Sequence, residues 1–227
     1  MIPPLIVHEA LERGINLLAV TDHNSTGNVI SVQKAARGTG LVVIPGIELQ
    51  TREEVHVLCL FETHEQMMEI QMFVDENLPV IENNSEFFGQ QYFVDETGEY
   101  IRSEDRLLSN SVNVTLKEAG EKVAALGGLF IPAHINRKAY GLIANLGLVP
   151  LDVHFDALEI SRHITPGEAR KTFPQIKPYH LVQNGDVHFL DGFLGANEFL
   201  CENPSIAELR MAILGQEQRS HSILSFL

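Results

Sequence analysis

The chain contains a short apolar run that leads directly into a carboxylate and an imidazole, Ile15-Asn16-Leu17-Leu18-Ala19-Val20-Thr21-Asp22-His23. Two other apolar runs end in the same way, since Leu41-Val42-Val43-Ile44 leads to Glu48 and Leu129-Phe130-Ile131 leads to His134. Short apolar runs bounded by turn residues are typical of buried strands. Because functional groups in α/β folds gather at the C-terminal ends of strands, we expect these polar side chains to share one site.

Two more segments carry residues of the same chemistry. His56 belongs to the apolar run of residues 55–60, and residues 186–188 place a carboxylate two positions before an imidazole. Histidine nitrogens and carboxylate oxygens suit Zn, Mn or Fe, and a carboxylate can bridge two ions. The candidate metal ligands are therefore His23, Glu48, His56, His134, Asp186 and His188.

Composition limits the class of protein. Of the 227 residues, 44% are hydrophobic, which is enough for one large domain, and we expect a single domain over residues 1–227. The net charge of -14 argues against a chain that binds nucleic acid by neutralising many of its phosphates. We therefore expect no stable binding of duplex nucleic acid. An anionic substrate would need bound cations to enter such a field.

The cysteines and the apolar runs bear on the compartment. Cys59 and Cys201 are too few for a disulfide scaffold, no apolar stretch approaches the roughly 20 residues of a membrane span, and no signal peptide is recognisable. We therefore expect a cytoplasmic protein that does not insert into membranes.

The order of the segments predicts alternating helices and strands, which favours parallel βα units. Helices are expected over residues 6–13, 26–37, 63–77, 115–126 and 205–214, and further strands over residues 55–60, 157–160 and 180–182. Residues 81–113 break this rhythm. They predict either an insertion or a helical excursion over one face, with a hairpin between residues 91–94 and 100–101.

The motifs, taken in order, resemble those of the PHP (polymerase and histidinol phosphatase) metal-dependent phosphoesterases. They are Thr21-Asp22-His23-Asn24, Pro45-Gly46-Ile47-Glu48, His56-Val57-Leu58, Pro132-Ala133-His134 and Gly185-Asp186-Val187-His188. The resemblance implies a distorted seven-stranded (β/α), or TIM-like, barrel with up to three metal ions at its C-terminal rim. By position, Glu48 would bridge two ions, His56 and His134 would complete one site, Asp186 would belong to the second, and His23 and His188 to a third.

The chain departs from the family at its start. The family opens with a strand that ends in His-x-His, and no such motif is present, so we expect the barrel to lack its first strand. Either the protein extends upstream of Met1 or it is a shortened member. An open barrel edge would expose unpaired backbone, which favours a homo-oligomer.

Four other residues are candidates for supporting roles. Asp22 either orients a ligand or its loop, or caps the helix that begins near residue 26. Arg137 and Arg162 could hold a phosphate by paired hydrogen bonds, or be solvated surface residues. His163 follows a strand and either faces the site or lies on the surface.

The leading hypothesis for function is metal-dependent hydrolysis of a phosphate ester, with a phosphorylated small molecule, a nucleotide or an oligonucleotide end as substrate. The alternative is a non-catalytic or truncated metal-binding module that acts in protein interaction. A third hypothesis, metal-dependent amide hydrolysis, is disfavoured because no lysine suited to a carbamate bridge is evident at the end of a predicted strand.

Overall fold

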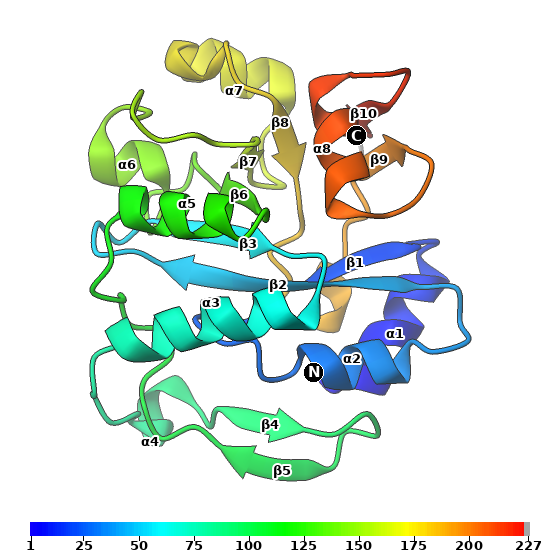
Figure 1. The fold of residues 1–227 in the computed structure, drawn as a ribbon, viewed down its shortest axis with the longest axis vertical. Coiled ribbons are helices and arrows are strands. Elements are labelled where there is room, and N and C mark those ends of the chain that lie inside the picture. The colour runs from blue at the N-terminus through cyan, green and yellow to red at the C-terminus, as the bar shows by residue number, and fades with distance from the viewer. Residues whose placement is uncertain (225–227) are drawn as a thin grey trace.

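The structure is a computed structural model that describes residues 1–224, and it has a mixed α/β fold (Figure 1). Its largest sheet has four strands in the order β1 (Leu17–Val20), β2 (Val42–Gln50), β3 (His56–Leu60) and β6 (Leu129–Pro132). Three strand pairs accompany it, and they are β7 (Leu158–Ile160) with β8 (Leu181–Gln183), β4 (Tyr92–Val94) with β5 (Tyr100–Ser103), and β9 (Asn197–Leu200) with β10 (Ser220–Ile223).

The expectation of parallel βα units is correct for only part of the sheet. Strand β1 runs parallel to β2, and β7 runs parallel to β8, but β3 is antiparallel to both β2 and β6. The reason is the length of the link between β2 and β3, because residues 51–55 form a short turn that can join only antiparallel strands. Strand β3 is therefore reversed relative to its neighbours.

The longer helices begin and end close to the predicted residues. They are α1 (Pro3–Glu12), α3 (His64–Asn77), α5 (Leu116–Ala125) and α8 (Ile206–Leu214), whereas α2 is shorter than expected, at Val29–Ala35. Thr63 and Thr115 each close a reciprocal capping box, with Gln66 and Glu118. The short helix α4 (Ser85–Phe88) lies in the stretch for which a helical excursion was one of two predictions. Sequence patterns gave no indication of α6 (Leu142–Leu146), α7 (Pro166–Thr172) or the β9–β10 pair.

Helices α3 and α5 cover one face of the four-stranded sheet, as Figure 1 shows. Ile47 and Cys59 from the sheet are fully buried in the same apolar cluster as Ile70 of α3 and Val123 of α5. This packing removes apolar side chains from water and holds β2 and β3 in place beneath the ligand-bearing residues.

The hydrogen-bonded strands of residues 1–224 do not form a closed barrel. Among these residues β1 pairs only with β2, and β8 pairs only with β7, so each has one free edge. Between these edges lies a cavity of about 1600 Å³, lined by all four residues of β1 and by Val182 and Gln183 of β8.

The predicted insertion forms α4 and the β4–β5 hairpin, which lies at one end of the molecule in Figure 1. Asn28 and Ser31 connect the hairpin to the segment that follows β1. The Asn28 amide donates to the Tyr92 carbonyl at 3.2 Å and accepts from the Val94 N–H at 3.1 Å, and Ser31 Oγ donates to the Val94 carbonyl at 2.6 Å. The insertion is thus fixed beside the loop that carries His23.

Within residues 1–224, the helices are all too short or too polar to cross a lipid bilayer.

Candidate metal site

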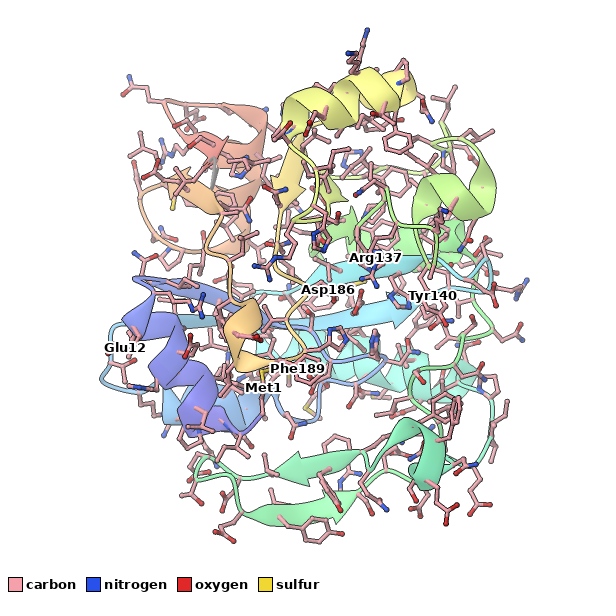
Figure 2. All side chains as sticks on the ribbon, turned by 180° about the vertical axis from the view of Figure 1, so that it is seen from behind. Met1, Glu12, Arg137, Tyr140, Asp186 and Phe189 are labelled. Carbon is pink, nitrogen blue, oxygen red and sulfur yellow. The ribbon has the colours of Figure 1, made fainter. Side chains whose placement is uncertain are left out.

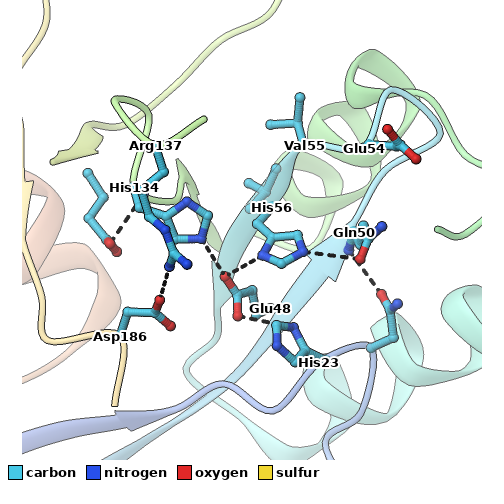
Figure 3. A network of polar contacts seen from close by, with 12 residues as sticks. His23, Glu48, Gln50, Glu54, Val55, His56, His134, Arg137 and Asp186 are labelled. Carbon is cyan, nitrogen blue, oxygen red and sulfur yellow. Dashed lines mark hydrogen bonds and ion pairs between the residues drawn. The ribbon is translucent and has the colours of Figure 1, made fainter. Parts of the chain in front are cut away.

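The carboxylate of Glu48 lies at the centre of a cluster of imidazoles (Figure 3). His56 Nδ1 is 3.1 Å and His134 Nε2 is 3.4 Å from Glu48 Oε1, and His23 Nδ1 is 3.2 Å from Oε2. Glu48, His56 and His134 are buried. His23, Glu48 and His56 offer ligand atoms that all lie within 4.8 Å of one another, which is close enough for one metal ion to contact all three residues.

Backbone pairing brings His23 to Glu48. His23 and Glu48 form a parallel bridge beyond the end of β1, in which the Asn24 N–H donates to the Glu48 carbonyl at 2.9 Å and the Glu48 N–H donates to the Asp22 carbonyl at 3.1 Å. Asn24 has φ 47°, a left-handed conformation that asparagine tolerates better than most residues. The turn at Asn24 therefore keeps the His23 ring over the Glu48 carboxylate.

The reversal of β3 explains the position of His56. His56 is the first residue of its strand, whereas His23 and His134 follow theirs. In the antiparallel register Gln50 faces His56, and Val57 faces Pro132, so the start of β3 lies beside the C-terminal ends of β2 and β6. His56, at the start of β3, thus reaches the same edge of the sheet as His23 and His134, which follow the ends of β1 and β6.

Two imidazole nitrogens of the cluster are buried without a hydrogen-bond partner among residues 1–224, His23 Nδ1 and His134 Nδ1. His23 Nδ1 faces Glu48 Oε2, whereas His134 turns its other nitrogen, Nε2, towards Glu48 Oε1. His56 Nε2 is 3.1 Å from Gln50 Oε1, so His56 turns Nδ1 towards Glu48 Oε1. Three imidazole nitrogens around one buried carboxylate form a donor set that fits a divalent metal ion.

Burial and charge within the cluster favour the ligand forms of Glu48 and His23, but they favour the protonated form of His134. Burial alone would raise the pKa of Glu48, but the contacts with His134 and His56 outweigh it and hold that pKa well below its ordinary value. Burial lowers the pKa of His23 despite the nearby Glu48 carboxylate. Burial also opposes protonation of His134, but here Glu48 outweighs it and raises the pKa. Glu48 is therefore an anion at neutral pH.

Asp186 and His188 lie together beyond the end of β8. His188 Nδ1 is 3.4 Å from Asp186 Oδ1, and the His188 and His23 rings have centroids 5.7 Å apart. Arg137 forms an ion pair with Asp186, as Figure 3 shows. The structure thus places all six predicted ligands at one end of the strands, with Asp186 neutralised by Arg137.

The other candidates are divided between the site and the surface. Asp22 accepts a hydrogen bond from the Asn28 side chain at 3.1 Å, and it caps no helix, because α2 begins later than expected and its first residues lack a side-chain cap. Arg162 donates to the Gly192 carbonyl at 2.8 Å, and both Arg162 and His163 are exposed. Like Arg137, these two residues are not among those that line the cavity beside the cluster, and unlike Arg137 they make no hydrogen bond or ion pair with a candidate ligand among residues 1–224.

Sequence patterns did not indicate several residues that support the cluster. The Tyr140 ring stacks on His56 with centroids 4.4 Å apart and an interplanar angle of 2°, and Tyr140 has φ 58°. Glu159 of β7 is 2% exposed, and burial raises its pKa to about 7. The signal for Glu159 was a carboxylate within an apolar strand, and for Gln50 a polar residue two positions after Glu48, on the same face of β2. Tyr140 had no such signal.

The cluster opens into the cavity beside β1. His23, Glu48, His134 and Asp186 all contribute to its lining, and so do Phe88 and Tyr92 of the insertion. Met1 and Phe189 also line it, and Figure 2 shows these two residues close together below Asp186. The insertion therefore forms one wall of the cavity next to the candidate metal ligands.

Solved structures with this fold include metal-dependent phosphoesterases and DNA endonucleases. The chain superposes on a metal-dependent phosphoesterase from Bifidobacterium adolescentis with a TM-score of 0.51 and 16% identity, covering 83% of this chain and 82% of that one. It superposes on the lesion-specific endonuclease EndoQ from Pyrococcus furiosus with a TM-score of 0.71 and 20% identity, covering 97% of this chain and 53% of that one. At these identities the likeness shows a common PHP-like fold.

Sequence comparison gives a distant relative. The uncharacterised protein YqxK of Bacillus subtilis is 24% identical over 240 residues, which cover 95% of this chain and 55% of that protein. The chain thus spans about half the length of this relative and of EndoQ. No family model matches the chain.

One comparison corrects the expectation about nucleic acid. Endonuclease Q in complex with a 27-mer duplex that contains an abasic lesion superposes on this chain with a TM-score of 0.65 and 21% identity, covering 96% of this chain and 52% of that one. Excluding duplex binding on the basis of net charge was wrong. Overall charge is a poor guide here because a groove with bound cations or local donors can hold phosphates within an acidic protein.

Proposed function

We propose that this chain carries a site for metal-dependent hydrolysis of phosphate esters, on a distorted (β/α) barrel of the PHP type. The observation that carries the proposal is the buried Glu48 carboxylate, which contacts imidazole nitrogens of His23, His56 and His134. If this carboxylate served only in a structural ion pair, one imidazole partner would be enough. Three imidazoles around one buried carboxylate instead form a donor set suited to metal ions.

The six ligands have the following proposed roles. Glu48, His56 and His134 would hold one ion, Glu48 and Asp186 would hold a second, and His23 with His188 would hold a third. Divalent ions in such a cluster supply Lewis acidity and generate a nucleophile from water at neutral pH. Asp22 is proposed to orient the His23 loop through its hydrogen bond with Asn28.

Arg137 is the proposed contact for the phosphoryl group. Its side chain is 44% exposed at the edge of the cluster, and its guanidinium already pairs with the Asp186 carboxylate. A guanidinium can donate two parallel hydrogen bonds to a phosphate as it does to a carboxylate. Arg137 can therefore orient a phosphate ester next to the ligands, whereas Arg162 and His163 have no such position.

The aromatic lining of the cavity favours a nucleic-acid substrate. Phe88 and Tyr92, which line the cavity from the insertion, are 52% and 53% exposed. Exposed aromatic rings can stack on nucleic-acid bases. We therefore propose a phosphodiester of a nucleic acid as the substrate, in agreement with the DNA complex of Endonuclease Q.

The experiment compares substrates and metals in the same assay. The chain is freed of metal with a chelator, loaded with Mn²⁺ or Zn²⁺, and incubated with bis-p-nitrophenyl phosphate, p-nitrophenyl phosphate and oligonucleotides with and without an abasic site. We expect the diester and the oligonucleotides to be cleaved only with metal. We also expect Glu48→Gln to abolish cleavage and Glu65→Gln, at an exposed residue of α3, to leave it unchanged. Metal-loaded protein with no activity on any of these substrates would reject the proposal.

A non-catalytic metal-binding module is the second candidate. The observation in its favour is the ion pair between Arg137 and Asp186, because it engages the carboxylate proposed for the second metal. In that case His134→Ala should lower the melting temperature of the metal-loaded chain, and wild type and variant should be equally inactive. A loss of turnover on the same substitution would instead support the enzyme.

A further inference from the structure

Two parts of the fold carry the candidate ligands, and among residues 1–224 no ladder of strand hydrogen bonds joins them. His134 follows β6 of the four-stranded sheet, whereas Asp186 and His188 follow β8 of the separate β7–β8 pair. Some other interaction must therefore set the distance between the two ligand-bearing segments. Beside β6 and β7 the backbone contributes the bonds from the Ile135 N–H to the Glu159 carbonyl, at 2.9 Å, and from the Asp156 N–H to the Phe130 carbonyl, at 3.1 Å. The Asn136 side chain also exchanges two hydrogen bonds with Ser161.

The side chain of Glu159 spans this gap. Its Oε1 accepts from the N–H of His134 at 3.2 Å, and its Oε2 accepts from the Nδ2 of Asn184 at 2.9 Å. Glu159 is 2% exposed. One buried carboxyl group thus connects His134, the second residue after β6, to Asn184, the first residue after β8. Asn184 lies two positions before Asp186.

The orientation of Asn184 is determined by its neighbours. Asn197 donates to the Gln183 carbonyl at 2.8 Å and accepts from the Gln183 N–H at 3.0 Å, so the backbone sets which end of the Asn197 amide faces Asn184. The Nδ2 of Asn197 then donates to Asn184 Oδ1 at 2.9 Å. Asn184 is left with its Nδ2 group facing Glu159, which must act as the acceptor.

Both connected segments have a backbone conformation that needs support. His134 has φ 30° and Asp186 has φ 48°, which lie in the left-handed region that residues with a side chain rarely adopt. Such conformations cost of order 1 to 3 kcal/mol each and persist only where surrounding contacts hold them. The bond to the His134 N–H acts directly on one of these residues.

We propose that Glu159 and Asn184 form a positioning pair, which sets the separation of His134 from the Asp186–His188 segment and thereby shapes the metal site. The proposal rests on the proposed function of that site. Both carboxylate oxygens of Glu159 are occupied by these two donors, so the residue acts through His134 and Asn184 and is not a ligand itself. Partners that orient ligands typically contribute 10- to 100-fold to metal affinity.

The acceptor at position 159 and the donor at position 184 can be exchanged by substitution, which provides a sharp test. Glu159→Gln places an amide NH₂ against the NH₂ of Asn184, and Asn184→Asp places a carboxylate against Glu159. The double variant E159Q/N184D restores a matched pair. Its new amide at position 159 would accept from the His134 N–H and donate to the new carboxylate at position 184, which can still accept from Asn197. The net charge of the double variant equals that of the wild type.

The experiment measures Mn²⁺ affinity by titration calorimetry for the wild type, both single variants and the double variant, with Glu198→Gln as a control at an exposed residue of β9. Melting of each metal-free variant is measured in parallel. We expect each single variant to bind Mn²⁺ about 10- to 100-fold more weakly and the double variant to recover to within about threefold. Should N184D fail to fold, Asn184→Ala, which removes the donor and adds no charge, replaces it.

The outcomes separate this proposal from the function on which it rests. Single variants that melt earlier but bind Mn²⁺ as the wild type does would overturn the positioning pair and leave the proposed function intact. A double variant as weak as E159Q would also overturn it, because that result indicates direct ligation by Glu159. A wild-type chain that binds neither Mn²⁺ nor Zn²⁺ would overturn the proposed function together with the pair.

Discussion

Gln50 and His56 face each other across the β2–β3 turn, and the Gln50 Oε1 atom lies 3.1 Å from His56 Nε2. This contact determines which nitrogen of His56 is turned towards Glu48. We expect Gln50→Leu to weaken Mn²⁺ binding by about 10- to 100-fold, because the ring loses the acceptor that orients it. Titration calorimetry measures the effect. Gln50→Glu keeps an acceptor at this position and should retain more of the affinity than Gln50→Leu.

Glu48→Gln tests whether the central carboxylate holds metal. The substitution keeps the shape of the side chain but removes the negative charge that faces three imidazoles. We expect elemental analysis of the purified variant to find less metal per chain than in the wild type, and turnover to fall below detection. Equal metal content in Glu48→Gln and wild type would contradict a bridging role.

Asn24→Ala should be strongly destabilising. The Asn24 side chain is fully buried, donates to the carbonyls of Leu108 and Asn110 at 2.8 and 2.7 Å, and accepts from the Gln50 N–H at 3.0 Å. Leaving these buried groups without a partner should cost about 3 to 5 kcal/mol, or roughly 6 to 20 °C in melting temperature. Calorimetry of Asn24→Gly alongside it isolates the backbone contribution, since glycine accepts the φ of 47° at this position.

Gly27→Ala tests how the insertion is held beside the site. A methyl group at Gly27 would overlap the Phe93 ring of β4, so the hairpin must move. We expect the melting temperature to fall by about 2 to 12 °C, which corresponds to about 1 to 3 kcal/mol of overpacking. Gly167→Ala is the matched control, because in the first turn of α7 an added methyl group meets no atom within 4 Å. An equal change of melting temperature in both variants would show that the contact between Gly27 and Phe93 does not hold the hairpin in place.

His221 should make the fold sensitive to acid. Burial, with a smaller contribution from His180, lowers the pKa of His221 to about 4, below the roughly 6.5 of an unfolded histidine. The unfolded state therefore takes up a proton first as pH falls, and stability that is complete above pH ~6.5 is lost towards pH ~4. The upper bound on this loss of stability is about 3 kcal/mol. The actual loss is smaller, because the ring is partly exposed to solvent.

The measurement for His221 is urea unfolding at pH 7 and pH 5 without metal. We expect His221→Gln, which can still donate to Asn197, to lose less stability between these values than the wild type. Ser222→Ala, at the next residue of β10, should lose as much as the wild type. If His221→Gln showed the full acid sensitivity, His221 would not be the responsible group.

The sequence by itself indicated the six proposed ligands and most of the helices and strands that carry them. Capping boxes at Thr63 and Thr115 and the apolar runs before His23 and His134 are local features, and the α3 and α5 helices and the strands follow from them. The motifs that follow the apolar runs also indicated that the ligands collect at one end of the strands. These signals act within a few residues along the chain, so they can be read without the fold.

Only the tertiary structure decided how those residues meet. The reversal of β3 sets His56 opposite Gln50, and the pairing of β7 with β8 apart from the main sheet makes Glu159 the connection between His134 and Asn184. Strand direction, register and buried hydrogen bonds join residues that are distant in the chain, as Glu159 and His134 are, and no local pattern encodes those partners.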